Sequence, residues 1–190
     1  SVGEVMAIGT TFQESMQKAL NSLENKTTGL TNVHRNLDKA GLYKKLSSNT
    51  PDKIFIIAQA FRIGFTLNEI YEITQIDKWF LSQLEELILF ENTIVDSGPN
   101  ISQDILREAK SMGFSDERIA ELSSTSLDDI QHKRQKYSIF PVYKRIDTCG
   151  GEFQSEAAYL YSTYHLSTST TQICEAHPSN RDKVIILGSG

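Results

Sequence analysis

Cysteine and histidine are the residues of this sequence that could hold a metal ion or act as nucleophiles. A zinc site needs three or four such ligands at short spacings, and a catalytic thiolate needs a neighbouring base. Cys174 and His177 stand three residues apart with no second pair, and Cys149 has no histidine near it in the sequence. We therefore expect no metal site and a packed thiol at Cys149. The histidines are His34, His132, His165 and His177.

A glycine-rich end is the second chemical candidate. Gly188, Ser189 and Gly190 follow the apolar run 183–187, as a phosphate loop follows a buried strand. A lone Gly-x-Gly is a weak signal, and the loop needs a following helix. We expect a strand and glycine loop truncated within a longer protein. An edge strand with a loose tail is the alternative.

Composition limits the class of protein. The sequence has 190 residues, 39% of them hydrophobic, and a formal net charge of -5. This suits one soluble domain with additional segments. No apolar run reaches the roughly 18 residues of a membrane span, and we expect no signal peptide. Two cysteines suit a reducing compartment, so we expect a cytoplasmic location.

Helical periodicity and capping residues dominate residues 12–137. Apolar residues recur at helical spacing in 12–24, and a short helix is expected near 38–46. Thr50 with Pro51, Thr66 with Glu69, and Asp77 are typical helix starts. Further helices are predicted to begin at Ser102, Ser115 and Ser126. The sequence thus predicts a mostly α fold.

Two stretches of this region repeat each other. The pattern around Gly64, Phe65 and Thr66 recurs 49 residues later at Gly113, Phe114 and Ser115. Glycine permits the left-handed end of one helix, and the hydroxyl starts the next helix. We expect a two-copy helix–turn–helix repeat whose copies pack on each other as one domain.

The sequence changes character after Tyr137. Residues 139–149 and 158–164 are β-branched and aromatic, so we expect extended segments that cross a surface rather than an independent sheet. Lys144 and Arg145 lie inside the first of these segments. We expect them to form ion pairs or backbone contacts rather than to take part in catalysis.

A stand-alone helix–turn–helix regulator is the alternative function. DNA binding requires a basic recognition face. Residues 50–99 hold three basic against eight acidic residues, and residues 102–137 hold six against seven. We therefore expect no nucleic-acid partner.

Several strings together carry a family resemblance. The sequence resembles the carbamoyl phosphate synthase large chain, from the end of its first ATP-grasp half through its central oligomerization domain. Thr10 departs from the family, which has arginine at this position, and Gly150 with Gly151 replaces two alanines. The matching strings are residues 3–9, 12–15, 17–20, 76–81, 83–87, 113–116, 118–120, 141–149, 152–153, 161–164 and 183–190.

The resemblance implies four regions. Residues 1–26 would end the first, carboxyphosphate half, and 27–137 would be the helical oligomerization domain. Residues 138–182 would be an extended linker, and 183–190 the truncated first strand of the second, carbamoyl phosphate half.

The resemblance also implies a function. The parent enzyme would make carbamoyl phosphate from glutamine-derived ammonia, bicarbonate and two ATP, for arginine and pyrimidine synthesis. ATP, Mg²⁺ (or Mn²⁺) and K⁺ would bind outside this segment, which by itself would hold no cofactor and be non-catalytic. Its partners would be the two ATP-grasp halves, further copies of the large chain and, as a candidate, the small glutaminase subunit.

Two residues are assigned roles through this resemblance. Glu4 matches a family glutamate near the interior route by which carbamate passes between active sites. A purely structural carboxylate is the open alternative. Leu67, taken as an exposed apolar residue of the repeat, is expected to lie on the self-association surface.

Overall fold

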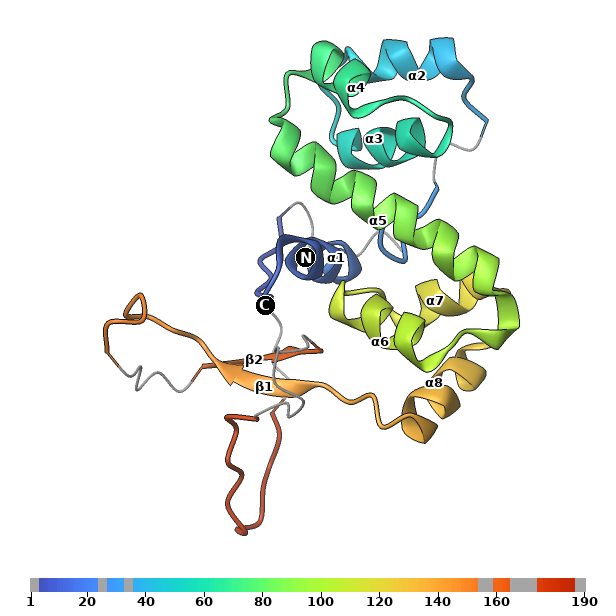
Figure 1. The fold of residues 1–190 in the computed structure, drawn as a ribbon. Helices are drawn as coiled ribbons and strands as arrows, with labels where there is room; N and C mark the ends of the chain where they lie inside the picture. The colour runs from blue at the N-terminus through green and yellow to red at the C-terminus, as the bar shows by residue number, and fades with distance from the viewer. Residues whose placement is uncertain (1–3, 24–26, 33–35, 154–158, 165–173, 187–190) are drawn as a thin grey trace.

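A computed structural model describes residues 4–23, 27–32, 36–153, 159–164 and 174–186. Within these residues the chain is mostly α-helical, as the sequence predicts, with a small sheet of two strands (Figure 1). The elements in chain order are α1 (Phe12–Ser22), α2 (Lys39–Leu46), α3 (Lys53–Arg62), α4 (Leu67–Thr74), α5 (Lys78–Ser97), the 3-10 helix η1 (Gly98–Asn100), α6 (Gln103–Ser111), α7 (Asp116–Ser123), α8 (Leu127–Lys136), β1 (Val142–Arg145) and β2 (Leu160–Thr163).

Capping side chains set most of the helix starts. The Thr66 hydroxyl accepts a hydrogen bond from the Glu69 amide, and the Glu69 carboxylate accepts one from the Thr66 amide. This confirms the predicted capping box, and Ser126 with Asp129 forms the same arrangement at α8. Each box satisfies amide groups that the first turn of a helix leaves without partners.

One predicted helix start is wrong. The Lys53 amide donates to the Thr50 carbonyl oxygen at 3.2 Å, so residues 50–52 form a turn ahead of the helix. Helix α3 therefore begins at Lys53, with Asp52 at its N-cap. Pro51 lies in this turn rather than in the first turn of the helix.

The two helix–turn–helix units share the conformation of their joints. Gly64, between α3 and α4, and Gly113, between α6 and α7, both have φ of 89°. The amides of Phe65 and Phe114 each donate to the carbonyl oxygen five residues earlier, at 3.0 and 3.1 Å. Both phenylalanine side chains are buried. The joints agree with the repeat, whose full extent stays a prediction.

Helix α5 connects the two units. The two units are predicted to pack on each other. This is wrong, because each unit instead packs on α5 (Figure 1). Helix α1 also packs on α5. The apolar spacing after Asp77 predicts Phe80, Leu81, Leu84, Leu87 and Ile88 on the buried face of α5, but Phe80 is 44% exposed and its ring contacts the rings of Phe12 and Trp79. The others are buried: Leu81, Leu84, Leu87 and Ile88.

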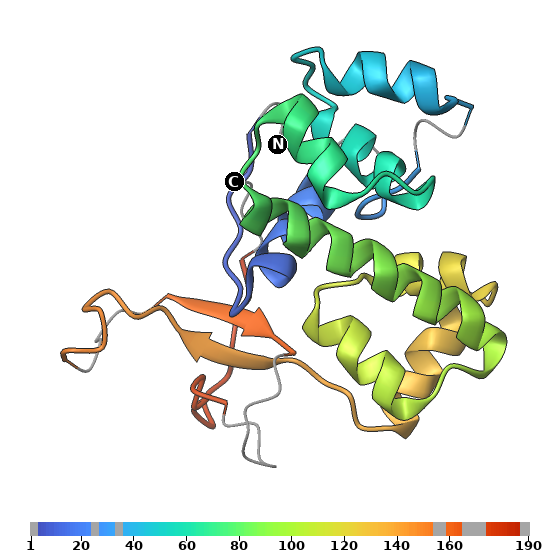
Figure 2. The ribbon, with the colours of Figure 1, turned by 45° about the horizontal axis from the view of Figure 1, so that its top comes forward.

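The segments after Tyr137 pair with each other. Strands β1 and β2 are antiparallel, with Val142 opposite Thr163, and form a ribbon to one side of the helices (Figures 1 and 2). The segments are extended as predicted, but they pair into a two-stranded sheet that the sequence analysis did not expect, because these β-branched and aromatic residues satisfy their backbone groups in a shared ladder. Lys144 forms an ion pair with Glu175 at 3.1 Å. Both residues lie in the segment predicted as the linker, so an interdomain ion pair at Lys144 or Arg145 stays a prediction.

The buried strand predicted at 183–190 is absent from its described part. Residues 183–186 belong to no strand, and Val184, Ile185 and Ile186 are between 83% and 90% exposed. A buried strand needs neighbouring segments for its backbone groups and side chains. No described segment pairs with these residues. Gly188, Ser189 and Gly190 lie outside the described residues.

Among the described residues, no helix combines the length and the apolar composition that crossing a bilayer requires.

Candidate functional site

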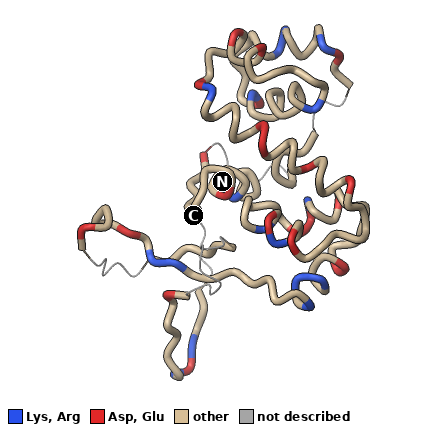
Figure 3. The backbone as a smooth tube through the Cα atoms, in the orientation of Figure 1, with Lys and Arg blue, Asp and Glu red and all other residues tan. Residues whose placement is uncertain are grey.

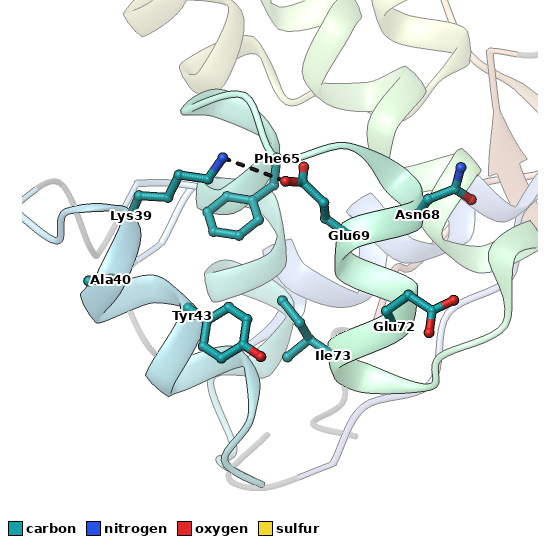
Figure 4. A pocket seen from close by; sticks show the side chains of 8 residues that line it. All are labelled: Lys39, Ala40, Tyr43, Phe65, Asn68, Glu69, Glu72 and Ile73. Atoms are coloured by element: carbon teal, nitrogen blue, oxygen red, sulfur yellow. Dashed lines mark ion pairs between the residues drawn. The ribbon is translucent and has the colours of Figure 1, made fainter.

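An apolar hollow lies between α2 and α4. Its volume is about 700 Å³, and Figure 4 shows side chains of both helices converging on it. Tyr43 from α2 and Ile73 from α4 face each other across one end, and Phe65 from the joint forms the wall at the other. The lining residues are Lys39, Ala40, Tyr43, Phe65, Asn68, Glu69, Glu72 and Ile73.

An ion pair closes one end of the hollow. The Lys39 ammonium lies 3.6 Å from the Glu69 carboxylate and 4.7 Å from the centre of the Phe65 ring (Figure 4). Hydrogen bonds from the Thr66 amide and hydroxyl, together with Lys39, hold the pKa of Glu69 below its usual value. Glu69 is therefore an anion whose carboxylate is already bound by the amide and hydroxyl of Thr66 and by Lys39.

The open end of the hollow differs in character. Tyr43 is 56% exposed although its ring lies against the apolar wall. The Glu72 carboxylate is exposed, and within the described residues its side chain has no ion pair or hydrogen bond. An exposed aromatic ring beside a free carboxylate can bind an apolar side chain with a cation next to it.

Leu67 does not line this hollow. Leu67 is predicted to be an exposed apolar residue, but its side chain is half-buried and packs against the hydrophobic core. The helical period explains this, because Leu67 and Ile70 are three residues apart and lie on one face of α4. Its role in self-association stays a prediction. A charge at Leu67 would perturb the core as well as any surface.

The other predicted site residues lie elsewhere. Glu4 is exposed and takes part in polar interactions, but it is not part of the hollow. Its proposed place on a carbamate route stays a prediction. The glycine loop at 188–190 is outside the described residues.

Sequence reasoning missed Tyr43 and Glu72. Residues 25–49 read as a polar linker with one short helix, so nothing in the local pattern marked Tyr43 as part of a surface. An aromatic residue in a polar stretch was the available signal, and it is a weak one. Glu72 was missed because a charged residue is expected at any solvent-exposed position of a helix, so the pattern did not distinguish it.

The two cysteines are free thiols and form no disulfide with each other. Cys149 is half-buried and Cys174 is exposed. Backbone hydrogen bonds involving Ala176 and Tyr143 lower the pKa of the Cys174 thiol. No group of three or more histidine, cysteine, aspartate or glutamate residues in the described part of the chain could hold a metal ion.

The charges do not favour a nucleic-acid interface. In Figure 3, basic and acidic positions are interspersed along the helical part of the chain. Arg134, in the basic last turn of α8, pairs with Asp116. Groove binding needs a cluster of free basic side chains. The helix–turn–helix regulator is therefore not supported.

Comparisons with known proteins give one consistent family. The sequence profile described as carbamoyl-phosphate synthetase large chain, oligomerisation domain, matches residues 4–138. Proteins named carbamoyl phosphate synthase large chain align with the whole of this chain, at 47% identity from Neisseria meningitidis serogroup A, 45% from Xanthomonas campestris pv. campestris and 44% from Vibrio cholerae serotype O1. The chain spans only 17% to 18% of the length of these relatives.

Proposed function

The chain belongs to the family of the carbamoyl-phosphate synthetase large chain oligomerisation domain, and on that premise we propose that it joins and spaces the two ATP-grasp halves of its parent chain and mediates self-association. The relatives are named for the whole large chain, of which this chain corresponds to about a sixth. The activity of the parent therefore depends on regions beyond these residues.

The proposed parent reaction forms carbamoyl phosphate from glutamine-derived ammonia, bicarbonate and two ATP, for arginine and pyrimidine synthesis. ATP, Mg²⁺ (or Mn²⁺) and K⁺ would bind to the flanking ATP-grasp halves, in the cytoplasm. The segment itself would be non-catalytic and hold none of these cofactors.

The proposed layout follows the sequence analysis. Residues 27–137 form the oligomerization domain, 1–26 complete the preceding half, 138–182 lead out of the domain, and 183–190 open the following half. Helix α1 falls in the first region although it packs on α5. It would therefore serve as the contact between the preceding half and the helical domain.

The hollow between α2 and α4 is the observation that supports a self-association surface. Helix α2 carries Lys44 and the adjacent α4 carries Glu72, and neither side chain forms an ion pair within the described residues, whereas Lys39 and Glu69 are paired with each other. In an isologous contact about a two-fold axis, α2 of one copy can face α4 of the other. The cationic α2 of each copy would then face the anionic α4 of the other copy at the apolar hollow.

Substitution of Tyr43 by glutamate in the full-length large chain tests this surface. Tyr43→Glu places a charge in the apolar centre of the proposed contact, where its desolvation opposes association. We expect association to weaken by about tenfold or more, measured as a fall in mass by sedimentation velocity across a dilution series.

Leu89→Glu is the matched control, because Leu89 is 61% exposed on α5 and does not line the hollow. Unchanged sedimentation of Tyr43→Glu, with a folded far-UV spectrum, would exclude this surface. A loss of mass in Leu89→Glu alone would place the contact on α5 instead.

The small glutaminase subunit is the second candidate partner for the same hollow. Co-purification of the glutaminase with wild-type large chain and with Tyr43→Glu separates the two functions. Self-association predicts equal recovery of glutaminase from both.

A further inference from the structure

A buried carboxylate connects two parts of the chain that are far apart in sequence. Glu14, in α1, is 1% exposed, and its Oε2 accepts hydrogen bonds from the Thr10 amide at 2.7 Å and the Thr10 hydroxyl at 2.9 Å. The same oxygen accepts a hydrogen bond from the hydroxyl of Thr163, in β2, at 3.0 Å. Glu14 and Thr163 are 149 positions apart, so this contact joins the segment before the helical units to the segment after them.

Lys18 ties the same two segments together. Its ammonium lies 3.1 Å from the other Glu14 oxygen and donates to the Ile8 carbonyl oxygen at 2.8 Å. It also donates to the Ser162 carbonyl oxygen of β2 and lies 5.7 Å from the centre of the Tyr161 ring. We refer to Glu14, Lys18 and Thr163 as the flank clamp.

A second contact holds the end of β2. The Tyr164 ring lies near two cations, 5.0 Å from the Lys110 ammonium and 5.3 Å from the Arg134 guanidinium. Asp116 pairs with both cations, with Lys110 at 2.8 Å. Strand β2 is therefore attached to α1 by Thr163 and to the second helix–turn–helix unit by Tyr164.

Stability alone is a weak reason for a buried carboxylate at this place. Removing a carboxylate from water is costly, and apolar side chains of similar volume often do as well or better. Directional bonds from one carboxylate to two separate segments, however, define how those segments are placed. A hydrophobic contact would hold the segments together without fixing their register.

From this geometry we infer that the flank clamp is a set of positioning residues for the parent reaction: it fixes the segment that precedes the helical domain against the segment that follows it. The inference rests on the proposed function, in which those segments lead to the two ATP-grasp halves. Loosening the clamp would let the halves shift relative to each other, and an unstable intermediate would then be lost between them.

Thr163→Val in the full-length enzyme tests the inference, because it removes one hydroxyl at nearly constant volume. We expect the ATP consumed per carbamoyl phosphate formed to rise by about threefold, while the ATP consumption rate remains close to wild type. Thr163→Ser keeps the hydroxyl and should restore the wild-type ratio. Glu14→Gln should raise the ratio as Thr163→Val does.

Glu108→Gln is the matched control, because Glu108 is exposed and its side chain has no bond among the described residues. Hydrogen exchange of the same full-length proteins gives a readout independent of activity. Glu14→Gln should speed exchange in residues 8–11 and in 160–163 together, whereas Glu108→Gln should change neither.

The outcomes separate the two proposals. A wild-type ratio in both Glu14→Gln and Thr163→Val, with unchanged exchange, overturns the flank clamp. A wild-type protein that makes no carbamoyl phosphate overturns the proposed function instead. In that case exchange decides the inference, and faster exchange in residues 8–11 without 160–163 overturns it.

Discussion

Gly113 and Gly64 occupy the same place in the two helix–turn–helix units but meet different surroundings. Both have φ of 89°, which side chains with a Cβ rarely adopt. A Cβ at Gly113 would lie 2.9 Å from the Glu14 Cα and the Gln17 Cβ, whereas a Cβ at Gly64 would meet nothing within 4 Å. Helix α1 therefore packs backbone to backbone against the second joint, while the first joint is open.

This difference gives a prediction with an internal control. Gly64→Ala carries only the cost of the left-handed conformation, about 1 kcal/mol. Gly113→Ala adds a clash with α1 and should cost about 3 kcal/mol or more. Urea unfolding of the two variants measures the difference in the free energy of unfolding. Equal losses would mean that α1 does not approach the second joint closely.

At the scale of elements, α5 is held to both units by one carboxylate. Glu91 lies 2.6 Å from Arg62, at the end of α3, and 2.7 Å from Arg118, in α7. Burial lowers the pKa of Arg118, but the Glu91 and Glu121 carboxylates outweigh that effect and raise it overall. Arg118 therefore remains charged, and Glu91 is a counter-ion that it shares with Arg62.

Glu91→Gln should destabilise the helical domain by about 3–5 kcal/mol, because two largely buried guanidinium groups lose their shared anion. Thermal unfolding followed by far-UV circular dichroism measures this loss. Glu85→Gln, on the same helix and without an ion pair in the described structure, should change the free energy of unfolding by less than about 0.5 kcal/mol. A small effect of Glu91→Gln would show that the arginines find other partners.

At the scale of the whole molecule, the hollow between α2 and α4 is the surface that we propose for binding. The hollow between α2 and α4 has one free carboxylate, and its lining includes no cysteine, histidine or serine. The features that join segments, the flank clamp and Glu91, consist of ion pairs and hydrogen bonds between residues of the chain itself. This arrangement is typical of a domain that positions other parts of a protein.

ATP with Mg²⁺ should therefore leave the thermal stability of the 190-residue chain unchanged. A ligand present at a hundredfold excess over its Kd stabilises a folded protein by about 2.7 kcal/mol, which is readily detected as a rise in Tm. Differential scanning fluorimetry at millimolar ATP measures this. A concentration-dependent rise in Tm would contradict a non-catalytic segment without its own cofactors.

The sequence by itself determined the features that depend on neighbouring residues. The capping boxes at Thr66 and Ser126, and the glycine joints, involve partners three to five positions apart, so their pattern is readable along the chain. The family could be identified for the same reason, because its motifs are local strings. The predicted start of α3 was wrong because Thr50 followed by Pro51 is typical both of a turn and of the first turn of a helix.

The tertiary structure alone decided which distant residues meet. Glu14 and Thr163, and Arg62, Glu91 and Arg118, are ordinary charged or polar residues in their local context. Their roles arise because burial removes water and leaves only other side chains and backbone groups to satisfy them. The hollow between α2 and α4 likewise exists only where two helices converge, and no periodicity along either helix encodes it.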